Sequence, residues 1–427
     1  MGHRPFKEAY QQLGARLDSL SVRTPWSETF HEILRELYSV DEAKLIVAMP
    51  FRPSSVERIS RLSGYPPSRL EPMLDRLCKK GLTVDLWDGK QYRYVVSPLV
   101  VGIFEFTMMR TDPGLDRKKI SRLFSRYLME EEAFGAANFT GDLQVSVKRA
   151  LPYEETLPDL PDVEILDYEK ASAIIDEHDC FSVGICSCRH EKFHLGRMRC
   201  DVPLETCTSF GNAARYLVRN NLAREISRSE MLDILARSKD SAFTLCADNV
   251  RDSVGFICHC CSCCCNLLEG IREKGYDRAL TTSNWLADCD MDNCRGCGKC
   301  AKACPIDAVA MQAAPGKNEN NQVPKVDDEL CLGCGACILR CDSRAMHLNP
   351  REQRVLHPAT SFERIILQCL ERGTLQNLVF DEPNSKSHRF FRGLVGGFLR
   401  LSPVKKALMG DQLRSRFLQV LTSRNSG

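Results

Sequence analysis

Two segments of the chain repeat the same spacing of cysteines, and this repeat constrains the fold more than any other feature. CRGCGKCAKACPIDAVAM begins at Cys294 and CLGCGACILRCDSRAMHL begins at Cys331, so the period is 331 − 294 = 37 residues. Each segment reads C-x2-C-x2-C-x3-C. Two-residue gaps let a tight loop wrap three thiolates around one cubane, while the fourth cysteine points toward the neighbouring cluster. The repeat therefore predicts two [4Fe–4S] clusters.

Because the fourth cysteines cross over, the spacing also assigns the ligands of each cluster. The first cluster is predicted to use Cys294, Cys297, Cys300 and Cys341. The second is predicted to use Cys331, Cys334, Cys337 and Cys304. Glycines between the ligands permit positive φ angles and a close approach of backbone N–H groups to sulfur. Paired CxxC motifs also bind zinc, but four evenly stepped cysteines, repeated, favour iron–sulfur clusters.

This segment resembles the bacterial dicluster ferredoxins over about 55 residues. Pro305 follows the first repeat as in those proteins, whereas Asp342 stands where the second repeat usually has proline. The departure affects the local turn and leaves all eight thiols in place. The resemblance implies a small pseudo-symmetric fold that transfers electrons.

The chain has 23 cysteines, and all but Cys78 and Cys369 lie between residues 180 and 341. The first twenty residues contain no apolar h-region and no small-residue cleavage site. A net charge of +2 indicates no general affinity for nucleic acid or anionic membranes. Dense cysteines in a chain without a secretory signal are typical of metal ligation in a reducing compartment. We therefore expect a cytoplasmic protein.

Ten further cysteines form a second field upstream of the repeat, and we expect all ten to bind metal. They are Cys186, Cys188, Cys200, Cys207, Cys258, Cys260, Cys261, Cys263, Cys264 and Cys265. The first four have the number that one [4Fe–4S] cluster requires, and the last six could hold another with two thiols to spare. Alternatively the two sets interleave. The expected cofactors are thus two to four [4Fe–4S] clusters.

The other thiols and the one histidine in this field are predicted to have ordinary roles. Free cysteine is commonly buried as a small hydrophobe, which is the expectation for Cys78, Cys180, Cys246, Cys289 and Cys369. Cys180, six residues before Cys186, is the strongest candidate for an exception. His259 is predicted to neighbour a cluster edge rather than to bind iron, because thiolates are abundant around it.

The segment from LPYEETLPDL through VGICSCRHEK, PLETCTSFG, ISRSEMLDIL and ICHCCSCCC resembles a family of multi-domain 4Fe–4S ferredoxin-like proteins from anaerobic bacteria and archaea. The resemblance extends over most of residues 35–345. It implies an electron-transfer protein and identifies no substrate.

Residues 28–110 are predicted to form a winged-helix-like domain. The pattern indicates capped helices over 54–64 and 68–81, followed by a β-hairpin whose turn is formed by Asp88 and Gly89. The second helix carries a net charge of only +2, a weak footprint for phosphate binding. This domain is therefore expected to serve in docking or homodimerisation rather than in DNA binding.

The sequence from Ser385 to Gly427 contains nine Lys or Arg residues and the single acid Asp411, a local net charge of +8. Interleaved Phe and Leu residues predict a basic amphipathic helical tail that docks on an anionic membrane or an acidic partner. The alternative is packing on the protein's own surface. The whole chain is thus predicted to be α+β, with a winged helix (28–110), a helix-rich Cys domain (111–285), a dicluster ferredoxin domain (286–350) and a tail (351–427).

Three functions are compatible with these features. The first is an electron-transfer protein that passes single electrons to a partner oxidoreductase. The second is a transcription regulator that senses redox state through its clusters. The third is a redox enzyme whose upstream cluster offers an open iron site to a substrate. The sequence contains no nucleotide-binding loop, flavin fingerprint or radical-initiating CxxxCxxC motif, which favours the first function over a stand-alone enzyme.

Overall fold

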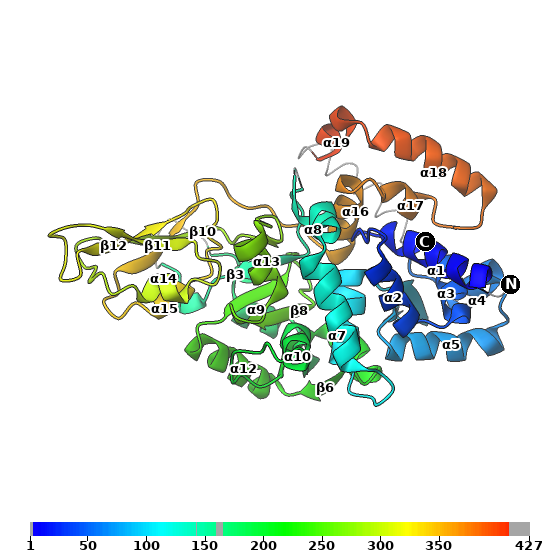
Figure 1. Ribbon diagram of the computed structural model, residues 1–427, viewed down its shortest axis with the longest axis horizontal. Helices are drawn as coiled ribbons and strands as arrows, with labels where there is room; N and C mark the ends of the chain where they lie inside the picture. The colour runs from blue at the N-terminus through cyan, green and yellow to red at the C-terminus, as the bar shows by residue number, and fades with distance from the viewer. Residues whose placement is uncertain (1–2, 142, 159–164, 410–427) are drawn as a thin grey trace. The chain divides into compact units, whose positions relative to one another are not determined.

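The computed structural model describes residues 3–141, 143–158 and 165–409 (Figure 1). Contacts between residues divide the chain into two compact units. Unit 1 combines Met1–Thr107, Arg122–Asn138 and Ser361–Gly427, and unit 2 combines Met108–Ser121 and Phe139–Thr360. The sequence suggested four successive domains, whereas the contacts give two units. The segment after residue 360 belongs with the N-terminal residues, and residues 139–360 belong to one unit.

Unit 1 is mainly helical and contains one β-hairpin. Its N-terminal helices are α1 (His3–Asp18), α2 (Glu28–Leu37), α3 (Val40–Ala48), α4 (Val56–Ser63) and α5 (Pro67–Lys79). The hairpin pairs β1 (Thr83–Trp87) with β2 (Tyr92–Val96) in antiparallel register. The next helices along the chain are α6 (Phe104–Met109), α7 (Arg117–Ser125) and α8 (Glu132–Phe139). Helix, helix and hairpin therefore follow one another over residues 56–96.

The caps of α4 and α5 differ from those expected. Ser55, not Ser54, caps α4 by accepting a hydrogen bond from the backbone N–H of Arg58. Helix α5 has no side-chain cap; it begins instead at Pro67, whose fixed φ suits a first helical position. The capping box expected at Ser68 therefore does not form. At the hairpin the carboxylate of Asp88 accepts hydrogen bonds from the backbone N–H groups of Lys90 and Gln91, which fixes the turn.

The C-terminal helices of unit 1 are α16 (Ser361–Glu371), α17 (Leu375–Val379), α18 (Lys386–Leu399) and α19 (Ser402–Met409). They share an apolar core that includes Leu370 and Leu399. Asp381, with 1% of its surface exposed, forms ion pairs with Arg58 at 2.9 Å and Arg52 at 3.2 Å. The first part of the expected tail is thus packed on its own unit, while Asp411 and the residues after it lie outside the described residues.

A seven-stranded sheet forms the centre of unit 2. The strand order is β6-β4-β5-β8-β7-β3-β9, and all neighbours are antiparallel except the parallel pair β3 and β9. The strands are β3 (Lys148–Leu151), β4 (Phe181–Ile185), β5 (Glu205–Phe210), β6 (Ala223–Ile226), β7 (Thr244–Asp248), β8 (Phe256–Cys260) and β9 (Leu280–Thr281). The helices between them are α9 (Ala171–Asp176), α10 (Ser187–His194), α11 (Gly211–Arg219), α12 (Arg228–Asp240) and α13 (Asn266–Lys274).

This sheet corrects the expectation of a helix-rich domain with a few short strands. Each strand has only two to six residues, so none is a conspicuous apolar run in the sequence. Strands β7 and β8 nevertheless alternate regularly. Leu245 and Ile257 contribute to an apolar core with α9 and α12. Cys246 belongs to a second core on the other side of the sheet, and Cys258 packs against that core.

The ferredoxin-like segment lies in the same unit. Its strands are β10 (Trp285–Cys289), β11 (Val309–Ala313), β12 (Gln322–Val326) and β13 (Met346–Pro350), and its helices are α14 (Lys299–Ala303) and α15 (Ala336–Leu339). β10 pairs with β13 and β11 pairs with β12, both antiparallel. Helices α14 and α15 lie side by side (Figure 1). Each half of the cysteine repeat thus supplies a loop followed by a short helix.

No helix among the described residues combines the length and the apolar composition that crossing a membrane requires.

Candidate metal centres

The ligands predicted for the second ferredoxin cluster surround one small cavity. It is lined by Cys331, Cys334 and Cys337 from the second repeat and by Cys304 from the first. Apolar side chains such as Ile306 and Leu332 complete the lining, and both are almost fully buried. Four thiols converging in an apolar setting are the donor set that a [4Fe–4S] cluster requires.

Three of the four ligands predicted for the first cluster, Cys294, Cys300 and Cys341, also lie together. Cys300 has Cys294 and Cys341 as its neighbouring thiols, so the fourth ligand again comes from the other repeat. Cys297 is exposed, whereas Cys300 is buried. Cys289, for which we expected ordinary core packing, lies in contact with Cys294. No motif marks Cys289 in the sequence; its position at the end of β10 brings it there.

Backbone N–H groups point at several of these sulfur atoms. The N–H of Ala308 donates to Cys304 Sγ at 3.2 Å, and that of Met346 donates to Cys341 Sγ at 3.4 Å. The N–H of Gly296 donates to Cys294 Sγ, also at 3.4 Å. Such bonds stabilise the negative charge of ligating thiolates and tune a cluster's potential.

Two glycines of the second loop cannot carry a side chain. Gly333 has φ +65°, and a Cβ there would lie 2.1 Å from the carbonyl oxygen of Trp285. Gly335 has φ +78°, and a Cβ there would lie 2.3 Å from Thr156 Oγ1. The loop that holds the second ligand set therefore packs directly on the backbone of β10.

The unusual Asp342 forms an ion pair with Lys299, which belongs to α14 of the other repeat. Both side chains are more than half exposed, so the pair contributes little to stability. It nevertheless joins the two halves of the repeat at the position where a proline was expected.

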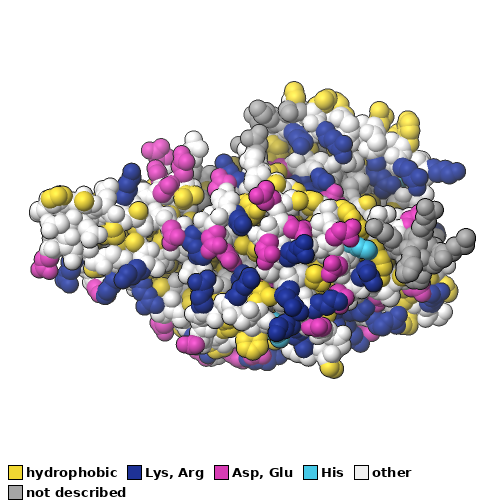
Figure 2. Space-filling model, in the orientation of Figure 1, with side chains coloured by type: hydrophobic (Ala, Val, Ile, Leu, Met, Phe, Trp, Pro, Cys, Tyr) yellow, Lys and Arg dark blue, Asp and Glu magenta, His cyan; other side chains and the backbone are white. Residues whose placement is uncertain are grey.

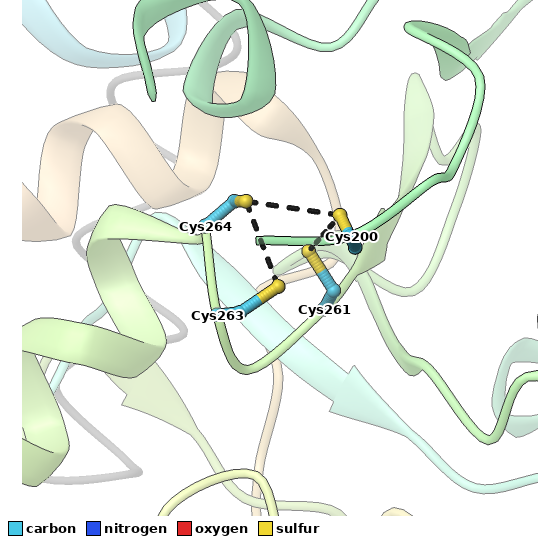
Figure 3. Close-up of side chains that lie close together, drawn as sticks. All are labelled: Cys200, Cys261, Cys263 and Cys264. Atoms are coloured by element: carbon cyan, nitrogen blue, oxygen red, sulfur yellow. Dashed lines mark hydrogen bonds between the residues drawn. The ribbon is translucent and has the colours of Figure 1, made fainter. Parts of the chain in front are cut away.

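Four upstream thiols come together in one compact set, which we call the Cys200 group (Figure 3). It consists of Cys200, Cys261, Cys263 and Cys264, whose Sγ atoms all lie within 4.8 Å of one another. Cys200 Sγ is 3.8 Å from both Cys261 Sγ and Cys264 Sγ, and Cys263 Sγ is 3.6 Å from Cys264 Sγ. Cys261 and Cys264 are 5% and 1% exposed, whereas Cys200 and Cys263 are half-buried.

The other six upstream thiols form a second set, which we call the Cys258 group. It consists of Cys186, Cys188, Cys207, Cys258, Cys260 and Cys265. Within it Cys188 contacts Cys265, and Cys258 contacts both Cys207 and Cys260. Cys246, which we expected to be ordinary core, also contacts Cys260.

The two sets interleave, so Cys186, Cys188, Cys200 and Cys207 do not form one centre by themselves. Strand pairing is the physical reason. β5 and β8 are neighbours, with Cys207 directly opposite Cys258, which brings Cys207 to the second set. Cys200 lies instead in the loop before β5 and meets the turn that follows β8. Sequence separation alone could not reveal this partition.

Two buried cations lie beside these thiols. Lys148 is 8% exposed, and its Nζ lies 3.7 Å from Cys258 Sγ. Arg189 is 1% exposed; it donates to the carbonyl oxygen of His259 at 2.7 Å and to Thr206. Burial alone lowers the pKa of Arg189, but the neighbouring thiolates of the two groups raise it above its ordinary value. Buried cations are stable when anions compensate them, and ligating thiolates provide that charge.

His259 lies on the opposite face of β8 from Cys258 and Cys260. Its Nδ1 is 2.7 Å from Ser238 Oγ and its Nε2 is 3.2 Å from Thr208 Oγ1. Burial lowers the pKa of His259 to about 4, so the ring is neutral near pH 7. Both ring nitrogens are thus engaged with hydroxyl groups, which leaves neither of them free to bind metal in this arrangement.

The remaining cysteines lie apart from the thiol groups. Cys180 precedes β4 and has Arg215, Glu225 and Asp179 as its charged neighbours. Cys78 is buried against Thr83, and Cys369 belongs to the core of the C-terminal helices. These three positions give no sign of metal ligation among the residues that the structure describes.

Comparison with protein families identifies one part of the chain. The model of a 4Fe-4S dicluster domain matches residues 293–345, a range that contains all eight predicted ferredoxin ligands. No curated protein and no solved structure matches the chain. The protein is therefore an iron–sulfur protein with a dicluster module, and the thiol groups upstream of the module are outside the matched residues.

Proposed function

We propose that this protein transfers single electrons to a partner oxidoreductase. The dicluster module is the basis of the proposal, with Cys294, Cys297, Cys300 and Cys341 holding one [4Fe–4S] cluster and Cys331, Cys334, Cys337 and Cys304 holding the other. When bound, such clusters supply one-electron redox chemistry. The Cys258 group contains more than the four thiols that a third cluster needs.

One observation favours electron transfer over purely structural roles for the Cys258 group and the two ferredoxin ligand sets. Thiols of the Cys258 group and of both ferredoxin ligand sets contribute to a single buried core within unit 2. Tyr153, only 3% exposed, has both Cys260 and Cys334 as neighbours. This continuity supports electronic contact between the upstream group and the second ferredoxin ligand set.

The surface around Cys297 is the proposed contact area for the redox partner. Cys297 is the exposed member of the eight ferredoxin ligands. An exposed ligand brings its cluster close to a docked protein, whereas the other seven ligands are buried or half-buried and shield the clusters from solvent. We therefore propose that electrons enter at one of two places, the Cys258 group or the surface around Cys297, and leave at the other.

The test is a reduction cycle of anaerobically purified full-length protein. We expect visible absorbance to decrease on reduction with dithionite and to return on reoxidation, because thiolate-to-iron charge transfer depends on the cluster's oxidation state. A dicluster module filled with zinc would show neither change. A protein that contains iron and sulfide but does not cycle would contradict the electron-transfer proposal.

We further propose that α18 docks this protein on an anionic membrane surface. Phe390, Leu394 and Phe398 are 68%, 63% and 59% exposed, and their spacing forms one stripe along α18. Leu401, which is 53% exposed, follows just after the helix ends. Between residues 383 and 409 there are six Lys or Arg and no Asp or Glu. Figure 2 shows apolar and basic side chains gathered over α18. An apolar stripe bordered by basic residues is complementary to anionic headgroups.

Replacing Phe390, Leu394 and Phe398 together with serine is expected to weaken binding to phosphatidylserine-containing vesicles about 100-fold, because each apolar side chain contributes on the order of 1 kcal/mol or more. Vesicle co-sedimentation measures the change. Phe193→Ser, which removes an exposed phenylalanine of α10 (56% exposed) outside the stripe, is the matched control. Equal binding by the triple variant and the control, or equal binding to neutral vesicles, would contradict membrane docking and favour an acidic protein partner.

A further inference from the structure

We propose that the Cys200 group binds one thiophilic metal ion, iron or zinc, in tetrahedral coordination without bridging sulfide. This differs from the [4Fe–4S] cluster expected for these thiols from the sequence. It also goes beyond the proposed function, because a single-ion site would exist whether or not the chain transfers electrons.

The spacing of the sulfur atoms is the first argument. Four thiolates at about 2.3 Å from one ion form a tetrahedron whose edges are about 3.8 Å. In the Cys200 group three edges measure 3.6 to 3.8 Å, and no pair of Sγ atoms exceeds 4.8 Å. A four-iron cluster carries each thiolate on a different corner and therefore holds its thiolates farther apart.

The ferredoxin ligands provide an internal comparison. Among residues 3–141, 143–158 and 165–409, the Cys200 group is the one set of three or more potential ligands whose atoms all lie within 4.8 Å. The eight ferredoxin thiols are described as well, yet none of their trios is that compact. The same structure thus spaces thiols widely where the repeat requires cubanes and closely in the Cys200 group.

The surroundings of the group fit a closed site of negative charge. Four thiolates exceed the charge of one divalent ion, and the buried guanidinium of Arg189 lies beside Cys261. All four coordination positions are filled by protein, as in structural zinc sites and in single-iron electron-transfer sites. No position is left for a substrate or a sulfide bridge.

A metal ion can also reach the site. Cys200, Cys261 and Cys263 line a cavity of about 410 Å³. The half-buried Cys200 and Cys263 are therefore accessible, while Cys264 and Cys261 close the inner side. Ligand number, spacing, countercharge and entry path are the criteria by which a metal site is judged, and the group meets each of them.

The test compares metal and acid-labile sulfide in full-length variants purified anaerobically. Cys263→Ser and Cys200→Ser change half-buried positions and are each expected to remove about one metal ion per chain without any loss of sulfide. Cys180→Ser, a half-buried cysteine of the same unit away from the thiol groups, is the matched control and should lose nothing. The metal that is lost between the wild type and the variants identifies the ion. An iron site also gives a high-spin ferric EPR signal on oxidation, whereas a zinc site is spectroscopically silent.

Loss of about four iron atoms together with as many sulfides from either variant would overturn the proposal in favour of a cubane. Unchanged metal content in both variants would also overturn it. X-ray absorption of the wild type serves if a variant does not fold. At the zinc edge we expect sulfur scattering alone at about 2.3 Å. In the iron case the criterion is a high-spin ferric EPR signal of about one spin per chain on oxidation, and its absence would contradict a single iron ion.

Discussion

Replacing Cys304 with serine is expected to empty the second ferredoxin cluster and to leave the first in place, although Cys304 belongs to the first repeat. The reason is that Cys304 lines one cavity with Cys331, Cys334 and Cys337. The expected loss is about four iron atoms and four sulfides per chain. Iron and sulfide analysis of anaerobically purified protein measures it.

Double variants identify which cluster has been lost. Cys304→Ser combined with Cys331→Ser should lose no more iron than either change alone, because both thiols serve one cluster. Cys304→Ser combined with Cys294→Ser should lose about twice as much, since independent sites add. The reverse pattern would show that the fourth cysteines stay with their own repeats and would contradict the crossover.

Replacing Gly333 with alanine is expected to destabilise the loop of the second ligand set by about 3 kcal/mol, through a left-handed backbone and a steric overlap. The new Cβ would lie 2.1 Å from the carbonyl oxygen of Trp285 and 2.2 Å from Ser283 Oγ. Trp285 is held in β10 by its pairing with β13, so its carbonyl cannot move aside cheaply. We expect reduced iron occupancy and a lower melting temperature of the loaded protein.

Gly316→Ala separates the two causes. Gly316 also has a positive φ of +78°, but a Cβ there would meet no atom within 4 Å. Only the backbone cost remains, about 1 kcal/mol. If both variants lose the same stability and the same iron, the close approach of Gly333 to β10 does not matter and the packing described above is wrong.

The sequence was most informative where chemistry depends on local spacing. The steps between cysteines 294 and 341 predicted a dicluster module, and the family match over 293–345 confirms that coarser statement. The α+β class was also predictable from alternating and helical patterns, and the element order agrees with it. The finer features of the module, including the ligand sets, remain predictions with geometric support.

The partition of the upstream thiols was not predictable, because it depends on contacts between distant residues. Cys207 meets Cys258 only because β5 pairs with β8, and Cys200 meets Cys261 across a turn. His259 could be excluded as a ligand once strand alternation turned it toward Ser238. Cys246 and Cys289 carried no motif and were brought beside other thiols by the strands that contain them.

The direct test of electron transfer by this protein is a spin count by EPR on the fully reduced, anaerobically purified chain, followed by reoxidation. The two ferredoxin sites predict about two fast-relaxing spins from the module, which disappear on oxidation and return on a second reduction. Cys304→Ser should remove about one of them. A chain that carries its full iron and sulfide but gives no spins on reduction, or whose spins do not return in a second cycle, would contradict this account.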